Sequence, residues 1–333
     1  MNSADGHRVV QNTDHKVSNI SCTRWEEVTA TLMWHASFSV KMEAATAVRL
    51  IQVPSMGQPQ QVGIASTVNV EESTELSRLA QMLHQQPSGG GGGPLPHLLE
   101  IVLTCLKTSS KLLGSEKSLA ILYVTDRMPV DEDGREGDHV TQRFLETLNL
   151  LEGSSVFVVI RLSTDDQRVV DFYNDLDRRM DAVTMQRKPY GEESDYRHNL
   201  HLDVLDDFVS EAGAVHEHNP WLNYAYPLHL CRESAVQFPV FDALNDRPLQ
   251  MDELVEFLTL LFDRNQLAWA LQPLPNPQTH YADFRAEVMD MNRKAGSVYD
   301  PIKRRNALWI DMNQLDRIYG GQAMTPCTSC VIF

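Results

Sequence analysis

The sequence predicts an α/β fold: a doubly wound, mostly parallel sheet with one antiparallel hairpin strand and helices on both faces. Two continuously apolar runs, 119–124 and 156–162, are typical of strands buried on both faces of a parallel sheet. Between them, the spacing of Val140, Phe144 and Leu148 predicts a helix. Strand, helix and strand in this order form a right-handed crossover, so the two runs should be parallel neighbours in one sheet.

The bulk composition is that of a globular protein. The chain has 333 residues, of which 42% are hydrophobic and 22% are charged. Its formal net charge of -16 argues against nucleic acid as a partner and against electrostatic binding to anionic lipid. The five cysteines are scattered and predict no disulfide framework. We find no secretory signal and no apolar run of about 18 residues, so we expect a cytoplasmic protein.

The amino-terminal part combines an irregular segment with a helix and a hairpin. Residues 1–22 are polar and lack periodicity, so we expect no regular structure there. Thr23 and Glu26 form a capping box, in which each side chain satisfies a free backbone N–H group of the other residue. Apolar residues at helical spacing follow at Trp25, Val28, Leu32 and Ala36. Two runs, 47–53 and 61–67, flank a turn rich in proline and predict an antiparallel hairpin.

Two further helices are predicted before the first buried strand. Leu76, Leu79 and Leu83 mark one face of a helix. Five glycines, Gly89–Gly93, then precede Pro94, which suits the first turn of the next helix. We interpret the glycines as a tight loop into that helix, and a flexible linker is the alternative.

The carboxyl-terminal half is less regular. Apolar residues between 202 and 209 predict the start of a helix, and 251–262 gives the clearest amphipathic helix of the chain. Beyond it the periodicity weakens. We therefore assign 23–265 to one domain and 266–333 to an appended tail with short helices, one of them over 307–318.

The order of these features resembles a von Willebrand factor A-type domain between Thr23 and Phe262. The shared features are the helix, the hairpin, a Gly-rich turn before Pro94, and a strand that ends in Thr125 and Asp126. The resemblance implies a Mg²⁺ site at the carboxyl edge of the sheet, where ligands collect in open α/β folds. In the family, an Asp-x-Ser-x-Ser motif, a threonine from the Gly-rich loop and an aspartate after the fourth strand hold the ion, together with a carboxylate of a protein partner.

This chain departs from the family at most of those positions. Asp126 matches the last ligand, but Gly93 stands where the threonine is expected, and the Asp-x-Ser-x-Ser motif is absent with its strand. We expect residues 1–3 to mark the point where that motif has just ended, which makes this an N-terminally shortened form. The place beside 119–124 should then be empty, or covered by part of 1–21. One carboxylate builds no Mg²⁺ site, so we expect no cofactor unless a longer form supplies the motif.

Other candidate sites have ordinary structural explanations. The stretch 216–218, with His229 and Cys231, lacks the spacing of a zinc motif and is better interpreted as a polar helix end. The stretch 131–134 resembles the start of a calcium loop, but the remaining ligand spacing fails. We find no nucleophile–base pair and no Gly-x-Ser-x-Gly motif, so we expect no catalysis.

The last four residues, Cys330 to Phe333, match the pattern read by protein prenyltransferases, and a terminal Phe favours geranylgeranyl. Cys327 is a candidate palmitoylation site, which would reinforce Cys330 because one lipid chain holds a protein only marginally. The alternative is an ordinary, slightly hydrophobic end. If Cys330 is modified, the protein is a peripheral one at the cytoplasmic face of a membrane.

The sequence therefore predicts a non-catalytic protein-interaction module, held at a membrane by lipid, whose protein partner it does not identify. The alternatives are a soluble scaffold without lipid, a truncated form of a metal-dependent protein, and an α/β enzyme that uses Asp126 at the sheet edge. A substrate-dependent turnover lost on Asp126→Ala would favour the enzyme.

Overall fold

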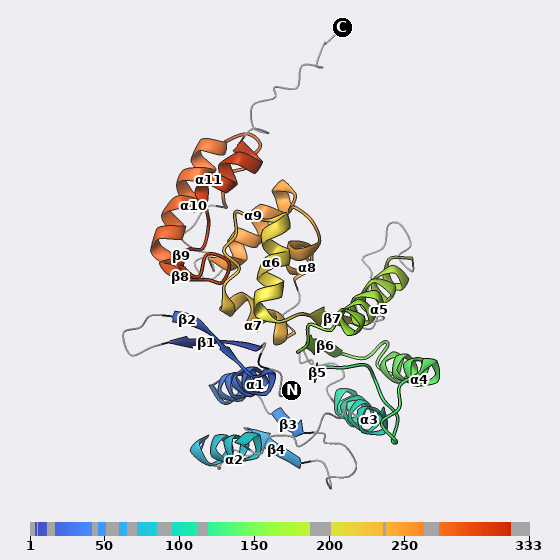
Figure 1. The fold of residues 1–333 in the computed structure, drawn as a ribbon. Helices are drawn as coiled ribbons and strands as arrows, with labels where there is room; N and C mark the ends of the chain where they lie inside the picture. Colours follow the sequence, from blue (N-terminus) through green and yellow to red (C-terminus); the bar gives the residue numbers. More distant parts are fainter. Residues whose placement is uncertain are drawn as a thin grey trace. The chain divides into compact units, whose positions relative to one another are not determined.

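The computed structural model describes residues 4, 6–11, 17–41, 46–50, 60–64, 72–84, 95–111, 119–186, 201–235, 238–262 and 273–320. In these ranges the protein is a mixed α/β structure with a three-stranded parallel sheet, two-stranded sheets and helices (Figure 1). The chain divides into two compact units. The first comprises 1–8, 21–207 and 233–235, and the second comprises 9–20, 208–232 and 236–333. This division does not coincide with the expected boundary at residue 265.

The first unit contains the parallel sheet, in the order β5–β6–β7. Strands β5 (Leu119–Thr125) and β6 (Val156–Leu162) pair in parallel, with Leu119 opposite Val156. The sequence prediction that these two runs are parallel neighbours is confirmed.

The third strand, β7 (His201–Leu205), was not expected. It pairs in parallel with β6, and Phe157 lies opposite His201. The predicted helix start at 202 is therefore wrong, because helix α6 begins only at Phe208. The spacing of Leu202 and Leu205 also suits a helix, and pairing with the apolar β6 decides for a strand.

Three helices form one hydrophobic core with the sheet: α3 (Leu95–Lys111), α4 (Asp138–Asn149) and α5 (Gln167–Gln186). Leu98, Phe144 and Tyr173 are buried in this core, one from each helix. From β6, the buried members are Val156, Val158, Ile160 and Leu162. These four residues alternate along the strand, so they share one face of the sheet, and Arg161 belongs to the opposite face.

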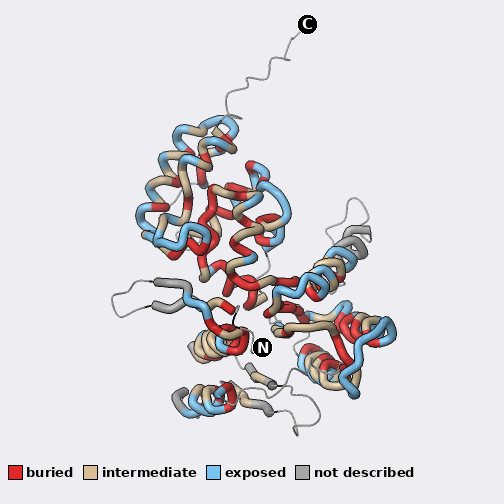
Figure 2. Tube along the Cα trace, viewed as in Figure 1, coloured by how far each residue is buried: buried red, intermediate tan, exposed pale blue. Residues whose placement is uncertain are grey.

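The two apolar strands differ in burial. Buried residues occupy almost the whole of β6, whereas most of β5 is only half-buried (Figure 2). The expectation that β5 is buried on both faces is therefore wrong. The physical reason is its place in the sheet, since β6 pairs on both sides and β5 is an edge strand among the described strands.

The remaining elements of the first unit surround helix α1 (Arg24–Lys41). The capping box is confirmed: the backbone N–H of Thr23 donates to Glu26 Oε2 at 2.8 Å, and that of Glu26 donates to Thr23 Oγ1 at 3.2 Å. The indole of Trp25 donates to the carbonyl of Leu83, so α1 is bonded to helix α2 (Glu72–His84).

Two pairs of short strands precede the parallel sheet in the sequence. Strands β3 (Thr46–Leu50) and β4 (Gln60–Ile64) are antiparallel, which confirms the predicted hairpin. The segment 1–22, expected to be irregular, instead contains β1 (Gly6–Gln11) and β2 (Val17–Cys22), which pair with each other. Backbone hydrogen bonds satisfy such a pair without the apolar periodicity by which strands are recognised in a sequence.

The second unit is mainly helical. Its elements are α6 (Phe208–His218), most of α7 (Tyr226–Glu233), α8 (Pro239–Asp246), α9 (Met251–Leu261), α10 (Tyr281–Ala295), β8 (Ser297–Asp300), β9 (Arg305–Leu308), α11 (Met312–Leu315) and a π-helix (Asp316–Gly320). The amphipathic helix predicted over 251–262 is confirmed as α9.

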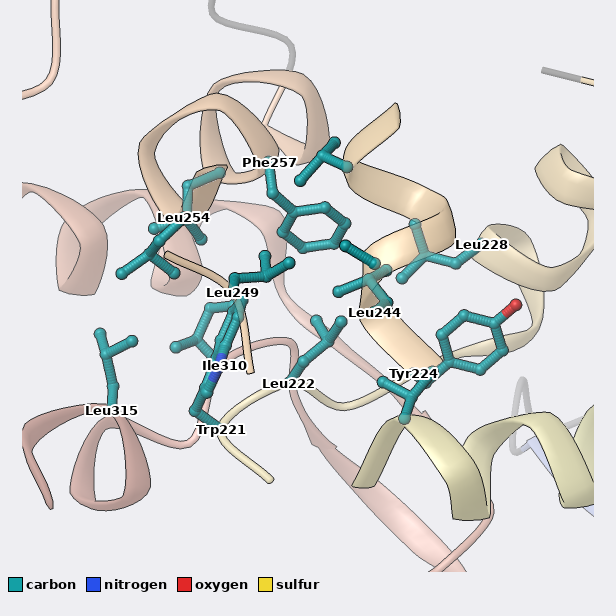
Figure 3. Close-up of a cluster of buried hydrophobic side chains, with 14 of the residues drawn as sticks. Trp221, Leu222, Tyr224, Leu228, Leu244, Leu249, Leu254, Phe257, Ile310 and Leu315 are labelled. Atoms are coloured by element: carbon teal, nitrogen blue, oxygen red, sulfur yellow. The ribbon is translucent and has the colours of Figure 1, made fainter. Parts of the chain in front are cut away.

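One hydrophobic core holds this unit together (Figure 3). Trp221 and Phe257 meet edge to face inside it, and Ile310 and Leu315 contribute from the end of the chain. Several described residues after 265, among them Phe284, Ile310 and Leu315, contribute to this core, where the sequence predicts an appended tail. Ile310, Leu315 and Tyr319 lie in or beside short elements at the end of the described chain, where a periodicity search finds little.

The side chain of Asn219 is the polar centre of the second unit. It is fully buried, and its amide nitrogen donates to the carbonyls of Leu244 and Arg247 at 2.8 and 2.9 Å. Its oxygen accepts from the backbone of Leu249 at 3.1 Å and from the indole of Trp221 at 3.2 Å. One amide thus satisfies backbone groups on both sides of the turn between α8 and α9.

We predict that Asn219→Ala destabilises the second unit by about 2–4 kcal/mol, because it leaves several buried polar groups without partners. Chemical denaturation with tryptophan fluorescence measures the change. Asn306→Ala on the exposed part of β9 is the control and should be nearly neutral. Equal losses in the two variants would contradict the role of the Asn219 side chain.

Candidate functional site

The carboxyl edge of the parallel sheet gathers polar residues from all three strands. Thr125 and Asp126 come at the end of β5, Ser163 to Asp166 follow β6, and Asp206 and Asp207 follow β7. Because parallel strands end at the same edge, this is where open α/β folds bind ligands. We therefore consider it the candidate site of this protein.

Asp126, the residue that matches the family's metal position, lies at this edge. Its side chain is 13% exposed, and Arg127 Nε donates to its Oδ1 at 3.1 Å. Burial alone would raise the pKa of Asp126, but nearby positive charge, including Arg127, outweighs it and holds that pKa below its ordinary value. The carboxylate is therefore ionised and already bonded to a cation.

One carboxylate after β6 and one after β7 are bonded to Arg24, the first residue of α1. The guanidinium is buried and donates to Asp165 at 2.5 Å and to Asp207 at 3.4 Å. It also contacts Glu27, one turn further along the helix, at 3.3 Å. Burial disfavours the charged form, but Glu27, then Asp207 and Asp165, hold the pKa of Arg24 above its ordinary value.

A second buried guanidinium, that of Arg161, lies on the face of β6 opposite the hydrophobic core. Its Nε donates to Glu233 Oε1 at 2.7 Å, and its two Nη atoms donate to Glu27 and to the carbonyl of Leu162. Burial again opposes ionisation, and Glu233 and Glu27 raise the pKa of Arg161 above its ordinary value. Glu27 therefore joins the two arginines. We call Arg24, Glu27, Arg161, Asp165, Asp207 and Glu233 the arginine–carboxylate cluster.

His35 and Ser234 lie beside this cluster. His35 Nε2 is 3.3 Å from Glu233 Oε2, and Ser234 Oγ is 3.5 Å from His35 Nδ1. Serine, histidine and glutamate in this order resemble a nucleophile with its base and orienting acid. Two observations disfavour that interpretation: the serine–histidine distance exceeds a normal hydrogen bond between a hydroxyl and an imidazole, and Glu233 is already bonded to Arg161. We interpret His35 as a support of Glu233.

The bonds at this edge bear on the Mg²⁺ site that the family resemblance implies. Mg²⁺ needs several oxygens that converge on one point, and here guanidinium groups bond the carboxylates instead. Among the described residues, no group of three or more histidine, cysteine, aspartate or glutamate side chains is arranged to hold a metal ion.

The other candidate residues are placed as follows. His216 and His218 lie in the last turn of α6, and His229 and Cys231 lie in α7. Asp131 Oδ1 accepts from the backbone of Asp133 at 2.9 Å and of Arg135 at 2.8 Å, so it stabilises its own turn. The predicted loop at Gly89–Gly93, Pro94, and the predicted lipidation sites Cys327 and Cys330 lie outside the described residues.

The arginine–carboxylate cluster was not predicted from the sequence, although one signal for it was present. Arg161 is the one charged residue in the apolar run 156–162, which predicts a buried strand. A charge on such a strand needs a buried counter-ion, because an isolated ion is too costly to bury. The sequence does not indicate that Glu27 and Glu233 supply it, since both are remote along the chain.

Comparisons of the chain with protein-family models, curated proteins and solved structures find no match. Across the part of the chain that the structure describes, no helix is both long and apolar enough to cross a membrane.

We predict that Arg161→Met destabilises the protein by about 3–5 kcal/mol, because it leaves Glu27 and Glu233 buried without this cation. Thermal unfolding followed by circular dichroism measures the loss. The matched control is Arg143→Met on the exposed side of α4, which should change stability by less than about 0.5 kcal/mol. A similar stability of the two variants would show that the buried pairs contribute little.

A second prediction concerns Mg²⁺. Because Asp126 is bonded to Arg127, about 1 mM Mg²⁺ should leave the melting temperature unchanged relative to EDTA in the wild type and in Asp126→Ala. Differential scanning fluorimetry makes this comparison. A rise with Mg²⁺ that Asp126→Ala abolishes would restore the metal site that the family resemblance implies.

Proposed function

We propose that this protein is a non-catalytic protein-interaction module that accepts an additional β-strand at the outer edge of β5. The observation that carries the proposal is the unpaired edge itself. In the described part of the chain, β5 pairs only with β6, and no strand lies against its other side. An edge of this kind presents backbone donors and acceptors that a strand of a partner can satisfy.

The hydrogen bonds at the two ends of β5 identify the residues that form this edge. The amide of Leu119 donates to Ser155 at 2.9 Å, and the carbonyl of Thr125 accepts from Ser163 at 2.8 Å, so both point toward β6. Backbone groups alternate in direction along a strand. Ala120, Leu122 and Val124 therefore direct their N–H and C=O groups toward the outer edge.

The side chains of β5 support the same proposal. None of its seven residues is charged, and the strand contains neither proline nor glycine. Such uninterrupted apolar strands are typical of the interior of parallel sheets, yet most of β5 is only half-buried. A further strand would bury the outer parts of Leu122 and Val124 and satisfy their backbone groups at once.

The arginine–carboxylate cluster supports a binding role rather than a catalytic one. Asp165 and Asp207, which follow the strands at the usual ligand edge, are bonded to Arg24. The resemblance to von Willebrand factor A-type domains agrees with this proposal, because in the doubly wound sheet of that family a further strand lies beside the position that β5 occupies here. Membrane attachment through Cys330 stays a separate prediction.

Hydrogen exchange tests the proposal without knowledge of the partner. In the monomeric protein, we predict that the amides of Ala120, Leu122 and Val124 exchange at least about 100-fold faster than those of Ile121 and Tyr123, which the alternation directs toward β6. Nuclear magnetic resonance resolves the individual amides.

The amides of β6 serve as the internal control, since this strand pairs on both sides and should be protected throughout. Protection of Ala120, Leu122 and Val124 in the monomer would show that another part of the chain covers the edge. The proposed docking surface would then not exist.

A further inference from the structure

We infer that the turn of the β8–β9 hairpin binds a short acidic segment of a protein partner, one that also carries apolar residues. The surface consists of Ile302, Lys303, Arg304 and Arg305, and we call it the hairpin surface. It lies in the second unit and shares no residue with the edge of β5, so the two proposals can fail independently.

The hairpin leaves large apolar side chains partly in contact with water. Ile302 is 41% exposed in the turn, and Leu308 on β9 is 42% exposed. Two of the seven large hydrophobic residues that are exposed in the described part of the chain thus belong to this one short hairpin. A single exposed apolar residue is ordinary, but apolar residues beside arginine are typical of protein interfaces.

The turn has a shape that its exposed side chains do not determine. Asp300 pairs with Arg305 across the hairpin, and residues 301–304 connect the strands. Asp300 is buried, and its Oδ1 accepts from the backbone of Ile302 and of Lys303, both at 2.9 Å. Lys303 Nζ lies 3.4 Å from the other oxygen of the same carboxylate. These bonds use backbone groups and Lys303, so the side chains of Ile302 and Arg304 remain available to a partner.

Arg304 occupies a backbone position that favours glycine. Its φ is 52°, in the left-handed region, where a side chain costs on the order of 1–2 kcal/mol. Glycine, asparagine or aspartate is the usual residue in that region. An arginine here places a cation on the turn at a cost to stability, and strained positions of this kind cluster at functional sites.

The hairpin surface is positive although the chain as a whole is acidic. Between 293 and 305 the chain carries five lysine and arginine residues, and the one acidic residue, Asp300, is buried in the turn. Arg304 and Arg305 are exposed, and neither pairs with a carboxylate of the described residues. Two guanidinium groups beside an apolar side chain therefore complement a segment with carboxylates and apolar residues.

The charge of the rest of the chain favours a short occupant over an extended one. Residues 1–265 carry 39 acidic and 22 basic residues, so a membrane or a nucleic acid would also meet this negative charge. Exposed charges more than about 8 Å apart are largely screened at physiological salt, so a segment that contacts only the hairpin responds mainly to the local charge. Each strand of the hairpin is about 13 Å long, which suits a segment of about four to eight residues.

Selection from a random peptide library on the immobilised full chain tests the inference. The double variant Arg304→Gln, Arg305→Gln serves for counter-selection. We expect peptides specific to the wild type to be rich in aspartate and glutamate next to leucine, isoleucine or valine. Their dissociation constants, measured by fluorescence anisotropy, should rise about tenfold in the double variant and should also rise between about 0.05 and 0.5 M salt.

The matched control is the double variant Arg135→Gln, Arg143→Gln, which removes two exposed charges elsewhere and should bind the peptides like the wild type. Arg304→Gly separates binding from stability. Because glycine suits the backbone at this position, the variant should melt at or above the wild-type temperature and still bind the peptides more weakly. Melting curves confirm the folding of the other variants.

Three results would overturn the inference. The first is a selection that returns no peptide specific to the wild type, and the second is a set of specific peptides without acidic enrichment. The third is binding to phosphatidylcholine vesicles with about 30% phosphatidylserine that the variant Arg304→Gln, Arg305→Gln loses, since the surface would then belong to a membrane contact.

Discussion

The buried guanidinium of Arg161 is the constraint on which the organisation of the first unit depends. It stands on a strand that is otherwise apolar, where an isolated charge would be too costly to bury. Two carboxylates balance the charge of Arg161. Glu27 is 134 residues away from Arg161 in the sequence, and Glu233 is 72 residues away. Since removal of either partner would leave a buried charge, the cluster ties α1, β6 and the end of α7 to one arrangement. Stability alone does not explain it, because apolar residues would stabilise the same contact as well.

This use of charge also decides what the carboxyl edge of the sheet can do. A ligand site at that edge needs side chains that are still available to the ligand. Here Arg24 bonds Asp165 after β6 and Asp207 after β7, and Arg127 bonds Asp126. The two ion pairs of Arg24 also hold the start of α1 against this edge. Within the described chain, the backbone of β5 is unpaired on one side, and this is the surface that we propose for a partner.

How far the sequence predicts this structure depends on how local the determining interactions are. The capping box at Thr23, the hairpin of β3 and β4, and the pairing of β5 with β6 follow from neighbouring residues or from one crossover, and all three are confirmed. The arginine–carboxylate cluster, strand β7 and the joining of the last residues to the second core depend on remote partners. In each case the local sequence is compatible with two structures, such as a helix or a strand for 201–205. Only the contacts with a remote part of the chain decide between them.

Strand β5 is a case in which the local prediction of a strand is correct and the predicted burial is not. Its apolar run correctly predicts a strand, but burial on both faces does not follow, because a local pattern does not indicate how many neighbours the strand has. Within the described chain, β6 supplies one neighbour, and the burial of β5 stops at half. The discrepancy between the predicted and the observed burial is therefore informative. Where a strand is more apolar than its place in the sheet explains, the missing neighbour is a physical reason to infer a partner, and the direction of the unpaired backbone groups indicates where that partner binds.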